Sequence, residues 1–340
     1  MMRITVLASG SRGNSSVISG GRTRILLDAG LSCRELLRRM AQADEDPATL
    51  DAILITHEHQ DHVAGLGVLA RKLRIPVYIT EATHRAWVRQ LTPTKRMTYA
   101  DWLAQRKLER EATTVAQQAS AVAVNVIEQI FSESDSEIVA EHTPSAEIPA
   151  DSAEELEAPT APAALKAVTT APTYLPAVEH FAAGSPFRIG DLDITPFTIP
   201  HDAADPCGFV FAAEGIRIGV ATDLGYVPQN VKQALQRLDV LMLESNHDLE
   251  MLRDGPYPWP TKQRIMSRVG HLSNVTAAEF LADDYDGHAA YVLLAHLSEN
   301  NNLPQLARIA AEQALAAHMD LLGNRLLLAQ QAAPLPTIAL

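Results

Sequence analysis

The sequence predicts an α+β protein whose folded part is interrupted by a long acidic segment. Short apolar or β-branched runs alternate with helical patterns over residues 3–101, and again over 187–317. Between them, residues 103–175 hold 12 acidic and 4 basic side chains, a charge of 4 − 12 = −8, with much Ala, Ser, Thr and Pro. The predicted regions are a first half of the fold at 1–102, an insertion at 103–175, a second half at 176–317 and a C-terminal extension at 318–340.

The first half is predicted to start with a three-stranded meander and to continue as strand, helix and strand. Gly-rich turns separate the first three apolar runs, and residues 51–56 have the composition of a buried strand. Apolar residues recur at helical spacing over 63–73. The predicted strands are Arg3–Ala8, Ser15–Ser19, Thr23–Leu27, Asp51–Thr56 and Pro76–Thr80, and the predicted helix is Val63–Leu73.

The insertion is predicted to be helical at first and then disordered. Residues 103–130 contain good helix formers, whereas 132–173 lack the apolar surface that would offset the entropy of ordering. The second half alternates strands with helices. Its predicted strands are Phe187–Asp191, Asp193–Ile199, Gly208–Ala213, Ile216–Ala221, Val240–Leu243 and Tyr291–Ala295, and its predicted helices are Val227–Leu238, Thr276–Ala282 and Pro304–Ala317.

The composition predicts a cytoplasmic protein that does not associate with membranes. No apolar run reaches the length of a transmembrane helix, and Cys33 and Cys207 are too few for a disulfide framework. The net charge of −13 opposes a broad basic surface for nucleic acid. Because the insertion holds −8, the rest of the chain carries only −13 − (−8) = −5. Any binding of a nucleic acid is therefore expected to depend on a few contacts in one place rather than on a broad basic surface.

The strongest chemical signal is the segment Thr56-His57-Glu58-His59-Gln60-Asp61-His62, which directly follows an apolar strand. Imidazole and carboxylate are both ligands for metals such as zinc. Alternate residues at a strand end point together, so His57 and His59 can face one metal while Asp61 and His62 face a second. A solvated His-rich turn is the alternative interpretation.

Three later strands also end in a candidate ligand. His201, Asp223 and His296 each follow an apolar run. Taken alone, each residue is better explained as a buried core residue or a cap than as a ligand. All three together with the first cluster indicate a metal site built from several strand ends.

These motifs resemble the metallo-β-lactamase family over about 3–101 and 178–317. His57, His59, Asp61 and His62 match its HxHxDH signature, and His201, Asp223 and His296 match its third, fourth and fifth motifs. The resemblance implies an αββα sandwich with a dinuclear metal centre between the sheets. It implies that one metal is bound by His57, His59 and His201, the other by Asp61, His62 and His296, and that Asp223 bridges them.

The resemblance also implies the chemistry of the site. Two divalent ions, zinc or manganese with iron also compatible, would lower the pKa of a shared water and make hydroxide available near neutral pH. That hydroxide attacks phosphorus or a carbonyl carbon. Asp61 is expected to orient the nucleophile or to take its proton, so we expect Asp61→Asn to abolish turnover.

Three further stretches, Pro200–Phe209, Leu243–Asp248 and Gly270–Asn274, narrow the resemblance to the YycJ/WalJ group. These proteins are related to RNase Z and are regarded as 5′-to-3′ exonucleases, so single-stranded DNA is the implied substrate and DNA repair the implied role. The 296 − 223 − 1 = 72 residues between the last two motifs leave no room for the domain that β-CASP nucleases insert there. An acidic insertion also cannot clamp phosphates as the arm of RNase Z does.

His271 and a polar loop are the candidate groups that contact substrate. By the same resemblance His271 would donate a hydrogen bond to the scissile phosphate or protonate the leaving oxygen, although this region also looks like the cap of the following helix. The Gly/Ser loop after the first strand can hold a phosphate, although an ordinary turn fits as well. The candidate substrate-binding residues are Ser11, Asn14, Ser15 and Asn246.

The remaining polar residues have weaker assignments. His247 is predicted to be a buried partner of a metal ligand rather than a ligand itself. The cationic candidates for contact with a DNA backbone are Arg12, Arg253, Lys262, Arg264 and Arg268. For the basic residues of the later group, a solvated helix face is an equally good explanation.

Two other functions stay open from the sequence. A thioester or lactone hydrolase of the glyoxalase type shares the first cluster, and a non-catalytic metal-binding adaptor would use the acidic insertion to dock a basic partner. The later motifs favour a phosphodiesterase, and the complete ligand set argues against an adaptor. Deletion of Ser132–Thr173 is expected to leave folding, metal binding and DNA binding intact.

Overall fold

The computed structural model describes residues 1–92, 103, 106–107, 171–316 and 325–340. The predicted helix over 103–130 and the predicted disordered segment 132–173 lie outside the described residues, apart from 103, 106, 107 and 171–173. The chain forms two units, one of residues 1–92 and 161–340 and the other of residues 93–160. Every strand among the described residues belongs to the first unit.

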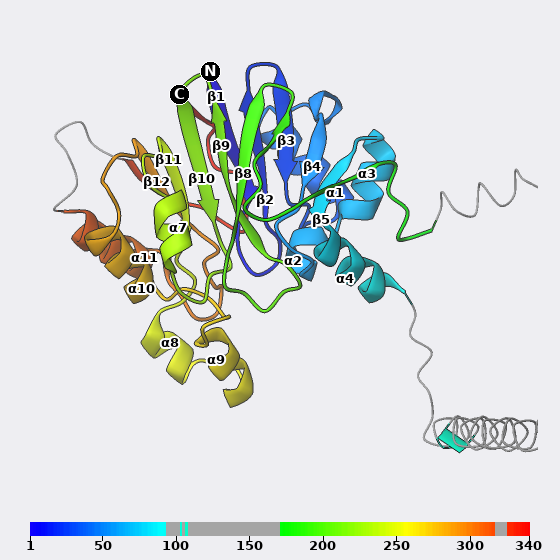
Figure 1. Ribbon diagram of the computed structural model, residues 1–340. Coiled ribbons are helices and arrows are strands. Elements are labelled where there is room, and N and C mark those ends of the chain that lie inside the picture. The colour runs from blue at the N-terminus through cyan, green and yellow to red at the C-terminus, as the bar shows by residue number, and fades with distance from the viewer. Residues whose placement is uncertain (93–102, 104–105, 108–170, 317–324) are drawn as a thin grey trace, which may run out of the picture. The chain divides into compact units, whose positions relative to one another are not determined.

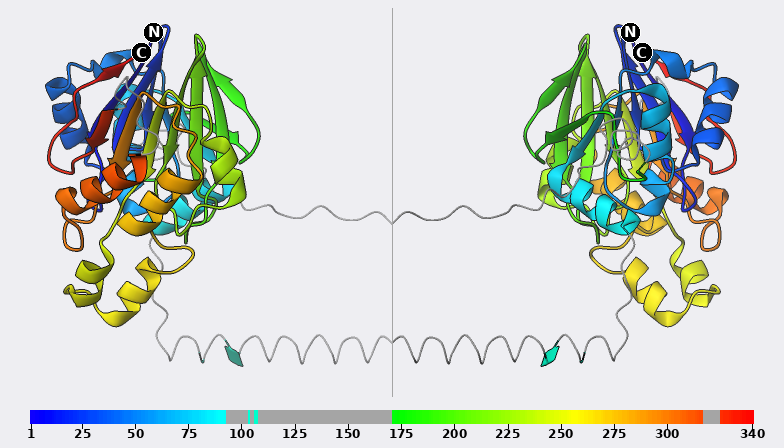
Figure 2. Two further views of the ribbon diagram at one scale, coloured as in Figure 1. Left: turned by 90° about the vertical axis from the view of Figure 1, so that its left-hand side faces the viewer. Right: turned by 90° about the vertical axis from the view of Figure 1, so that its right-hand side faces the viewer.

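Two mixed sheets lie face to face in the first unit (Figures 1 and 2), each with seven strands among the described residues. The order of the first sheet is β14-β1-β2-β3-β4-β5-β6, and the order of the second is β13-β12-β11-β10-β9-β8-β7. The first sheet contains β1 (Met2–Ala8), β2 (Ser15–Gly20), β3 (Thr23–Leu27), β4 (Ala52–Leu54), β5 (Val77–Thr80), β6 (Val178–Phe181) and β14 (Ile338–Ala339). The second contains β7 (Phe187–Ile189), β8 (Leu192–Thr198), β9 (Cys207–Ala213), β10 (Ile216–Ala221), β11 (Val240–Glu244), β12 (Tyr291–Ala295) and β13 (Arg325–Leu328).

Helices cover the outer faces of the two sheets. On the first sheet lie α1 (Cys33–Gln42), α2 (Gln60–Val63), α3 (Leu66–Leu73) and α4 (Glu81–Leu91), with the short 3-10 helix η1 (Pro47–Thr49). On the second lie α7 (Gln229–Ala234), α10 (Asn274–Asp283) and α11 (Pro304–Leu315). The helices α8 (Leu249–Asp254) and α9 (Trp259–Ile265) project beyond the strand ends (Figure 2).

Three apolar layers hold this arrangement together. The middle layer joins the two sheets, and Ile18 and Ile25 from the first share it with Phe209 and Phe211 from the second. One outer layer lies under α1, α3 and α4, and the other lies under α7, α10 and α11. Because both faces of each sheet are covered, most strands read as nearly continuous apolar runs rather than as alternating patterns.

The strand directions bring several strand ends to one edge of the sandwich. In the first sheet β3, β4 and β5 are parallel, and in the second β10, β11, β12 and β13 are parallel. Residues that directly follow parallel strands lie together at the carboxyl edge of a sheet. This edge is where the polar strand-end residues of the sequence meet.

The predicted α+β class and αββα sandwich are confirmed, with several differences in detail. The predicted helix Val63–Leu73 is formed over Leu66–Leu73 as α3, while Val63 ends the separate helix α2. The sequence patterns predicted none of α1, α4, α8 and α9. The segment predicted as a C-terminal extension supplies β13 and β14, an edge strand for each sheet. Among the described helices none is long and apolar enough to cross a bilayer.

Candidate metal centre

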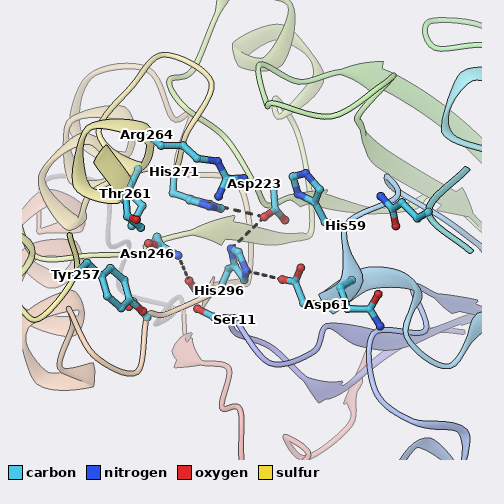
Figure 3. A pocket seen from close by; sticks show the side chains of 14 residues that line it. Ser11, His59, Asp61, Asp223, Asn246, Tyr257, Thr261, Arg264, His271 and His296 are labelled. Carbon is cyan, nitrogen blue, oxygen red and sulfur yellow. Dashed lines mark hydrogen bonds and ion pairs between the residues drawn. The ribbon is translucent and has the colours of Figure 1, made fainter. Parts of the chain in front are cut away.

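The predicted metal ligands meet at the shared edge of the two sheets. In Figure 3 the side chains of Asp61, Asp223 and His296 point toward one another, with His59 beside them. The residues come from both sheets: His57, His59, Asp61 and His62 follow β4, while His201, Asp223 and His296 follow β8, β10 and β12. The sandwich therefore has to form before these side chains can act together.

One group consists of His57, His59 and His201, whose candidate ligand atoms lie within 4.8 Å of one another. Nε2 of His201 is 3.1 Å from Nδ1 of His59. Nδ1 of His201 donates to the backbone oxygen of Gly270 at 3.1 Å, and Nδ1 of His57 lies 3.0 Å from the hydroxyl of Thr56. These bonds leave Nε2 of His57 and of His201 facing the space inside the group.

A second group consists of Asp61, His62 and His296. Oδ2 of Asp61 lies 3.5 Å from Nε2 of His62 and 3.4 Å from Nε2 of His296. Asp223 lies between the groups, because its Oδ2 is 3.3 Å from Nε2 of His62 and its Oδ1 is 3.9 Å from Nε2 of His201. These two groups contain the same residues as the two ligand sets that the resemblance implies, and Asp223 is near a histidine of each group.

Asp28, a residue to which the sequence analysis assigned no role, orients the first-sheet ligands. It follows β3, is buried, and its Oδ2 accepts a hydrogen bond from Nδ1 of His62 at 2.8 Å. The hydroxyl of Thr56 donates to the same carboxylate at 2.9 Å. A carboxylate on Nδ1 fixes the tautomer of a ligand histidine and leaves its Nε2 for a metal.

Glu244 has the same role on the second sheet, and the sequence analysis did not predict it. This residue ends β11 and is fully buried. Its Oε1 accepts from Nδ1 of His296 at 2.7 Å and from Nδ1 of His271 at 2.9 Å. Its Oε2 accepts from the backbone N–H groups of Leu224 at 2.7 Å and Leu272 at 3.1 Å. One carboxylate thus fixes a candidate ligand and the candidate acid at the same time.

Three residues of the site have a left-handed backbone. The φ angles are +57° at Asp28, +62° at Asp223 and +56° at His296. Residues other than glycine rarely adopt this conformation, and it is concentrated at functional sites where the surrounding structure enforces it. Asp28 and His296 directly follow a buried strand, and Asp223 is the second residue after one, so each turn directs its side chain to the shared edge.

The donor set fits divalent cations. Within the described part of the chain, Nε2 of His57, Nε2 of His296 and Oδ2 of Asp223 are buried atoms without a hydrogen-bond partner. Buried polar atoms without partners are rare in folded proteins, and these three lie in the ligand groups described above. Imidazole nitrogen and carboxylate oxygen are ligands of zinc, manganese and iron. Cations bound in the two groups would therefore provide partners for all three atoms.

The pKa shifts follow from burial and from the crowding of charges. Burial lowers the pKa of His57 well below its usual value, and this favours the neutral imidazole that a metal requires. In His62 burial also disfavours charge, but the carboxylates, above all Asp223 and Asp28, outweigh it and raise the pKa. Burial works against the charged form of Glu244 too, yet His271 and His296 lower its pKa to about 2. The carboxylate of Glu244 is therefore ionised at neutral pH.

A cavity of about 500 Å³ opens onto the two ligand groups. Two of the predicted substrate-binding residues, Ser11 and Asn246, line it. Asn14 is buried behind the cavity, and its Nδ2 lies 3.1 Å from Oδ2 of Asp61 and 3.1 Å from Nε2 of His62. Ser15 is also buried, and its hydroxyl donates to the backbone oxygen of Asp28 at 2.8 Å. The structure therefore brings Ser11 and Asn246 to the cavity, whereas Asn14 supports ligands and Ser15 supports the backbone.

The two remaining predicted histidines differ in position. His271 lines the cavity, and its Nδ1 is bound by Glu244, so its Nε2 is left for a substrate. Ser273 caps α10 as the alternative interpretation expected, so this region has both features. His247 is buried, but its Nδ1 has no hydrogen-bond partner among the described residues. The buried residues that contact candidate ligands in this way are Asp28 and Glu244, whereas no such contact is seen for His247 among the described residues.

Comparison with known proteins shows which family the chain resembles. The model of the metallo-beta-lactamase superfamily matches residues 8–116, and that of the beta-lactamase superfamily domain matches residues 135–297. The chain is 31% identical over 314 residues to exodeoxyribonuclease YycJ of Bacillus anthracis, a match that covers 92% of this chain and 89% of the relative. It is 30% identical over 314 residues to exodeoxyribonuclease WalJ of Streptococcus pneumoniae, covering 92% and 88%.

Solved structures show the same fold. The metallo-beta-lactamase fold protein YhfI from Bacillus subtilis aligns over 98% of both chains with a TM-score of 0.56 and 13% identity. Zinc-bound PqqB from Methylobacterium extorquens aligns over 100% of both chains with a TM-score of 0.56 and 16% identity. The sandwich, the His/Asp groups at its edge and the identity to YycJ and WalJ together assign this chain to the metallo-β-lactamase superfamily, as a metal-dependent hydrolase of the YycJ/WalJ group.

Proposed function

We propose that this protein is a dinuclear metal-dependent phosphodiesterase that degrades single-stranded DNA from the 5′ end. The observation that carries the proposal is the position of His271, whose Nδ1 is bound by Glu244 and which lines the same cavity as Asp61, Asp223 and His296. A diester cleavage needs a nucleophile at one face of phosphorus and a proton for the leaving oxygen. The exodeoxyribonuclease names of two relatives support the same reaction class.

The two ligand groups, His57 with His59 and His201, and Asp61 with His62 and His296, are proposed to hold one divalent ion each. Asp223 is proposed to be the shared ligand. Zinc and manganese suit this donor set, and iron is also compatible. When bound, such ions supply an activated water near neutral pH and neutralise charge on the reacting phosphate.

The protein's own residues have separate tasks in this proposal. Asp61 orients the nucleophilic water or accepts its proton, and Nδ2 of Asn14 at 3.1 Å from Oδ2 holds that carboxylate in place. Glu244 accepts a hydrogen bond from Nδ1 of His271 and so orients the ring, which leaves Nε2 as the atom proposed to serve the leaving oxygen. Asn246 donates its side-chain N–H to the backbone oxygen of His296 at 2.8 Å and fixes the strand end at the cavity.

The test compares three substrates with purified protein loaded with zinc or manganese. A 5′-labelled single-stranded DNA, the same DNA protected at its 5′ end by phosphorothioate linkages, and a thioester are each incubated with the wild type and with Asp61→Asn. We expect the wild type to shorten the unprotected DNA only, and Asp61→Asn to be inactive despite retained folding. Thioester turnover without DNA degradation would favour a glyoxalase-type hydrolase, and turnover of none of them would favour a metal-binding adaptor.

The proposed function also includes a cellular location. We propose a cytoplasmic location, which two free cysteines, Cys33 and Cys207, are consistent with.

A further inference from the structure

One wall of the cavity is built by a single helix that none of the metal motifs includes. Thr261, Arg264 and Ile265 of α9 line it, and their i, i+3, i+4 spacing places them on one face of the helix. Tyr257, just before α9, continues the wall. Figure 3 shows Tyr257, Thr261 and Arg264 across the cavity from Asp61.

Of the described residues that line the cavity, Arg264 is the one lysine or arginine. The other four cationic candidates are engaged elsewhere. Arg12 pairs with Glu299, Arg253 pairs with Asp254, Nζ of Lys262 donates to the backbone oxygens of Arg253 and Gly255, and the guanidinium of Arg268 lies 4.3 Å from the ring centre of Tyr226. Among the described residues, Arg264 is therefore the one lysine or arginine that a phosphate in this cavity would meet.

The guanidinium of Arg264 is already oriented. Its Nη2 donates to Oδ1 of Asp202 at 2.9 Å and its Nε donates to Oδ2 of the same residue. Asp202 in turn follows the candidate ligand His201, with 3.6 Å between its Oδ1 and Nε2 of His201. This fork occupies one edge of the guanidinium, and the side chain of Arg264 is 52% exposed. The remaining N–H groups of the side chain can thus receive an anion without breaking the pair.

The helix that presents Arg264 is tied to the catalytic side of the cavity. The backbone N–H of His271 donates to the oxygen of Ile265 at 2.9 Å, and Nδ1 of His201 donates to the oxygen of Gly270. A Cβ atom at Gly270 would lie 2.1 Å from the oxygen of Ile265, so only glycine allows this close approach. The position of Arg264 is therefore fixed relative to a candidate ligand and to the candidate acid.

We propose that this wall is a subsite for the nucleotide next to the scissile phosphate, with Arg264 binding the phosphate of that nucleotide and the ring of Tyr257 stacking on its base. The inference rests on the proposed nuclease function and adds a substrate class to it: the site takes oligonucleotides in preference to simple phosphodiesters. Tyr257 is half-buried, and its hydroxyl is 3.1 Å from Nδ2 of Asn300, so one edge of the ring is fixed. Aromatic rings bind bases of any sequence in this way.

The experiment compares a single-stranded oligonucleotide with bis(p-nitrophenyl) phosphate, which has neither a neighbouring phosphate nor a base. We expect Arg264→Ala to raise KM for the oligonucleotide at least about tenfold more than KM for the small diester, and Arg264→Lys to recover part of the loss. The dependence of log(kcat/KM) on log[salt] should become shallower by about 0.7, the value for one lost phosphate contact on a single strand. Arg188→Ala, an exposed change on β7 outside the cavity, is the control and should match the wild type on both substrates.

Tyr257 is tested in the same way. Tyr257→Ala should raise KM for the oligonucleotide selectively, and Tyr257→Phe should restore it because the ring is kept. Equal losses on both substrates, or unchanged oligonucleotide kinetics in Arg264→Ala and Tyr257→Ala, would overturn the subsite. If the wild type cleaves the small diester but no DNA, the proposed DNA substrate itself is wrong, which separates the two failures.

Discussion

Oε1 of Glu244 lies 2.7 Å from Nδ1 of His296, and this pair is buried at the end of two adjacent parallel strands. The other oxygen of Glu244 accepts two backbone N–H groups, those of Leu224 and Leu272. A glutamine at this position has one acceptor oxygen and one NH₂ group in place of the two carboxylate oxygens. Its NH₂ group would then face either the two backbone N–H donors or the N–H donor of His296, and the contact on that side could not form. The carboxylate is therefore required for the geometry and not only for the charge.

We expect Glu244→Gln to weaken metal binding by about 10- to 100-fold, the usual effect of removing a partner that orients a ligand histidine. The buried amide should also lower the free energy of unfolding by about 1–3 kcal/mol. Competition with a chelator measures the affinity, and thermal unfolding measures the stability. Glu250→Gln, an exposed change on α8, is the control. Wild-type metal affinity in Glu244→Gln would contradict the role of this carboxylate.

His271→Ala should separate catalysis from metal binding. His271 belongs to a group with Asp223, Glu244 and His296, but it is absent from the two ligand sets proposed for the metals. We expect the rate of DNA cleavage to fall by about 10²- to 10⁴-fold, as for loss of a general acid, with metal content unchanged. Elemental analysis and single-turnover kinetics give the two values. Loss of metal in step with activity would instead show His271 to be a ligand.

Metal affinity should depend steeply on pH. Burial works against a proton on His62 and on His296, but nearby carboxylates raise the pKa of both rings above the usual value. A proton and a cation compete for the same nitrogen, so apparent affinity should fall as pH falls and rise with pH until the raised pKa values are passed. Two displaced protons correspond to about a hundredfold change in affinity per pH unit. Calorimetry in buffers of different ionisation enthalpy counts the protons released, and no release would contradict the prediction.

Gly30→Ala should disturb the site through the backbone. A Cβ atom at this position would lie 1.7 Å from the backbone oxygen of Asp61 and 2.6 Å from the nitrogen of Asn14. We expect a loss of at least about 3 kcal/mol in unfolding free energy, together with reduced metal affinity, because Asp61 must move. In the control Gly184→Ala, the new Cβ meets nothing within 4 Å and only the backbone at φ +81° is strained, at a cost of about 1–2 kcal/mol.

Deletion of residues 132–160 should leave the melting temperature, the metal content and DNA binding unchanged. The longer deletion of Ser132–Thr173, which the sequence alone suggested would be neutral, should instead be destabilising, because Nη1 of Arg71 lies 3.3 Å from the backbone oxygens of both Ala171 and Pro172. Leu175 next to them is buried against the first sheet. Differential scanning calorimetry of the two deletions compares them directly, and collapse of the shorter one would show that the insertion supports the fold.

The fold class could be predicted because the buried strands are continuous apolar runs, and the ligand groups could be predicted because a polar residue follows each run. The same signal marks Asp28 after β3 and Glu244 at the end of β11. Their role could not be assigned, however, because a carboxylate that binds a metal and one that binds a histidine look alike in sequence. The short helix α9 escaped prediction because only Lys262 and Ile265 of its residues are buried, so it has little apolar periodicity.

The metal centre also bears on how long the segment between His59 and His201 can be. His59 and His201, whose facing nitrogens are 3.1 Å apart, are separated by 142 positions that include the whole acidic insertion. A cation held by both would act as a covalent-like cross-link that closes this loop. The entropy of closing a flexible loop grows only with the logarithm of its length, so doubling the loop costs about 0.6 kcal/mol. A longer insertion between these two histidines is therefore expected to lower the stability of the metal-bound sandwich only slightly.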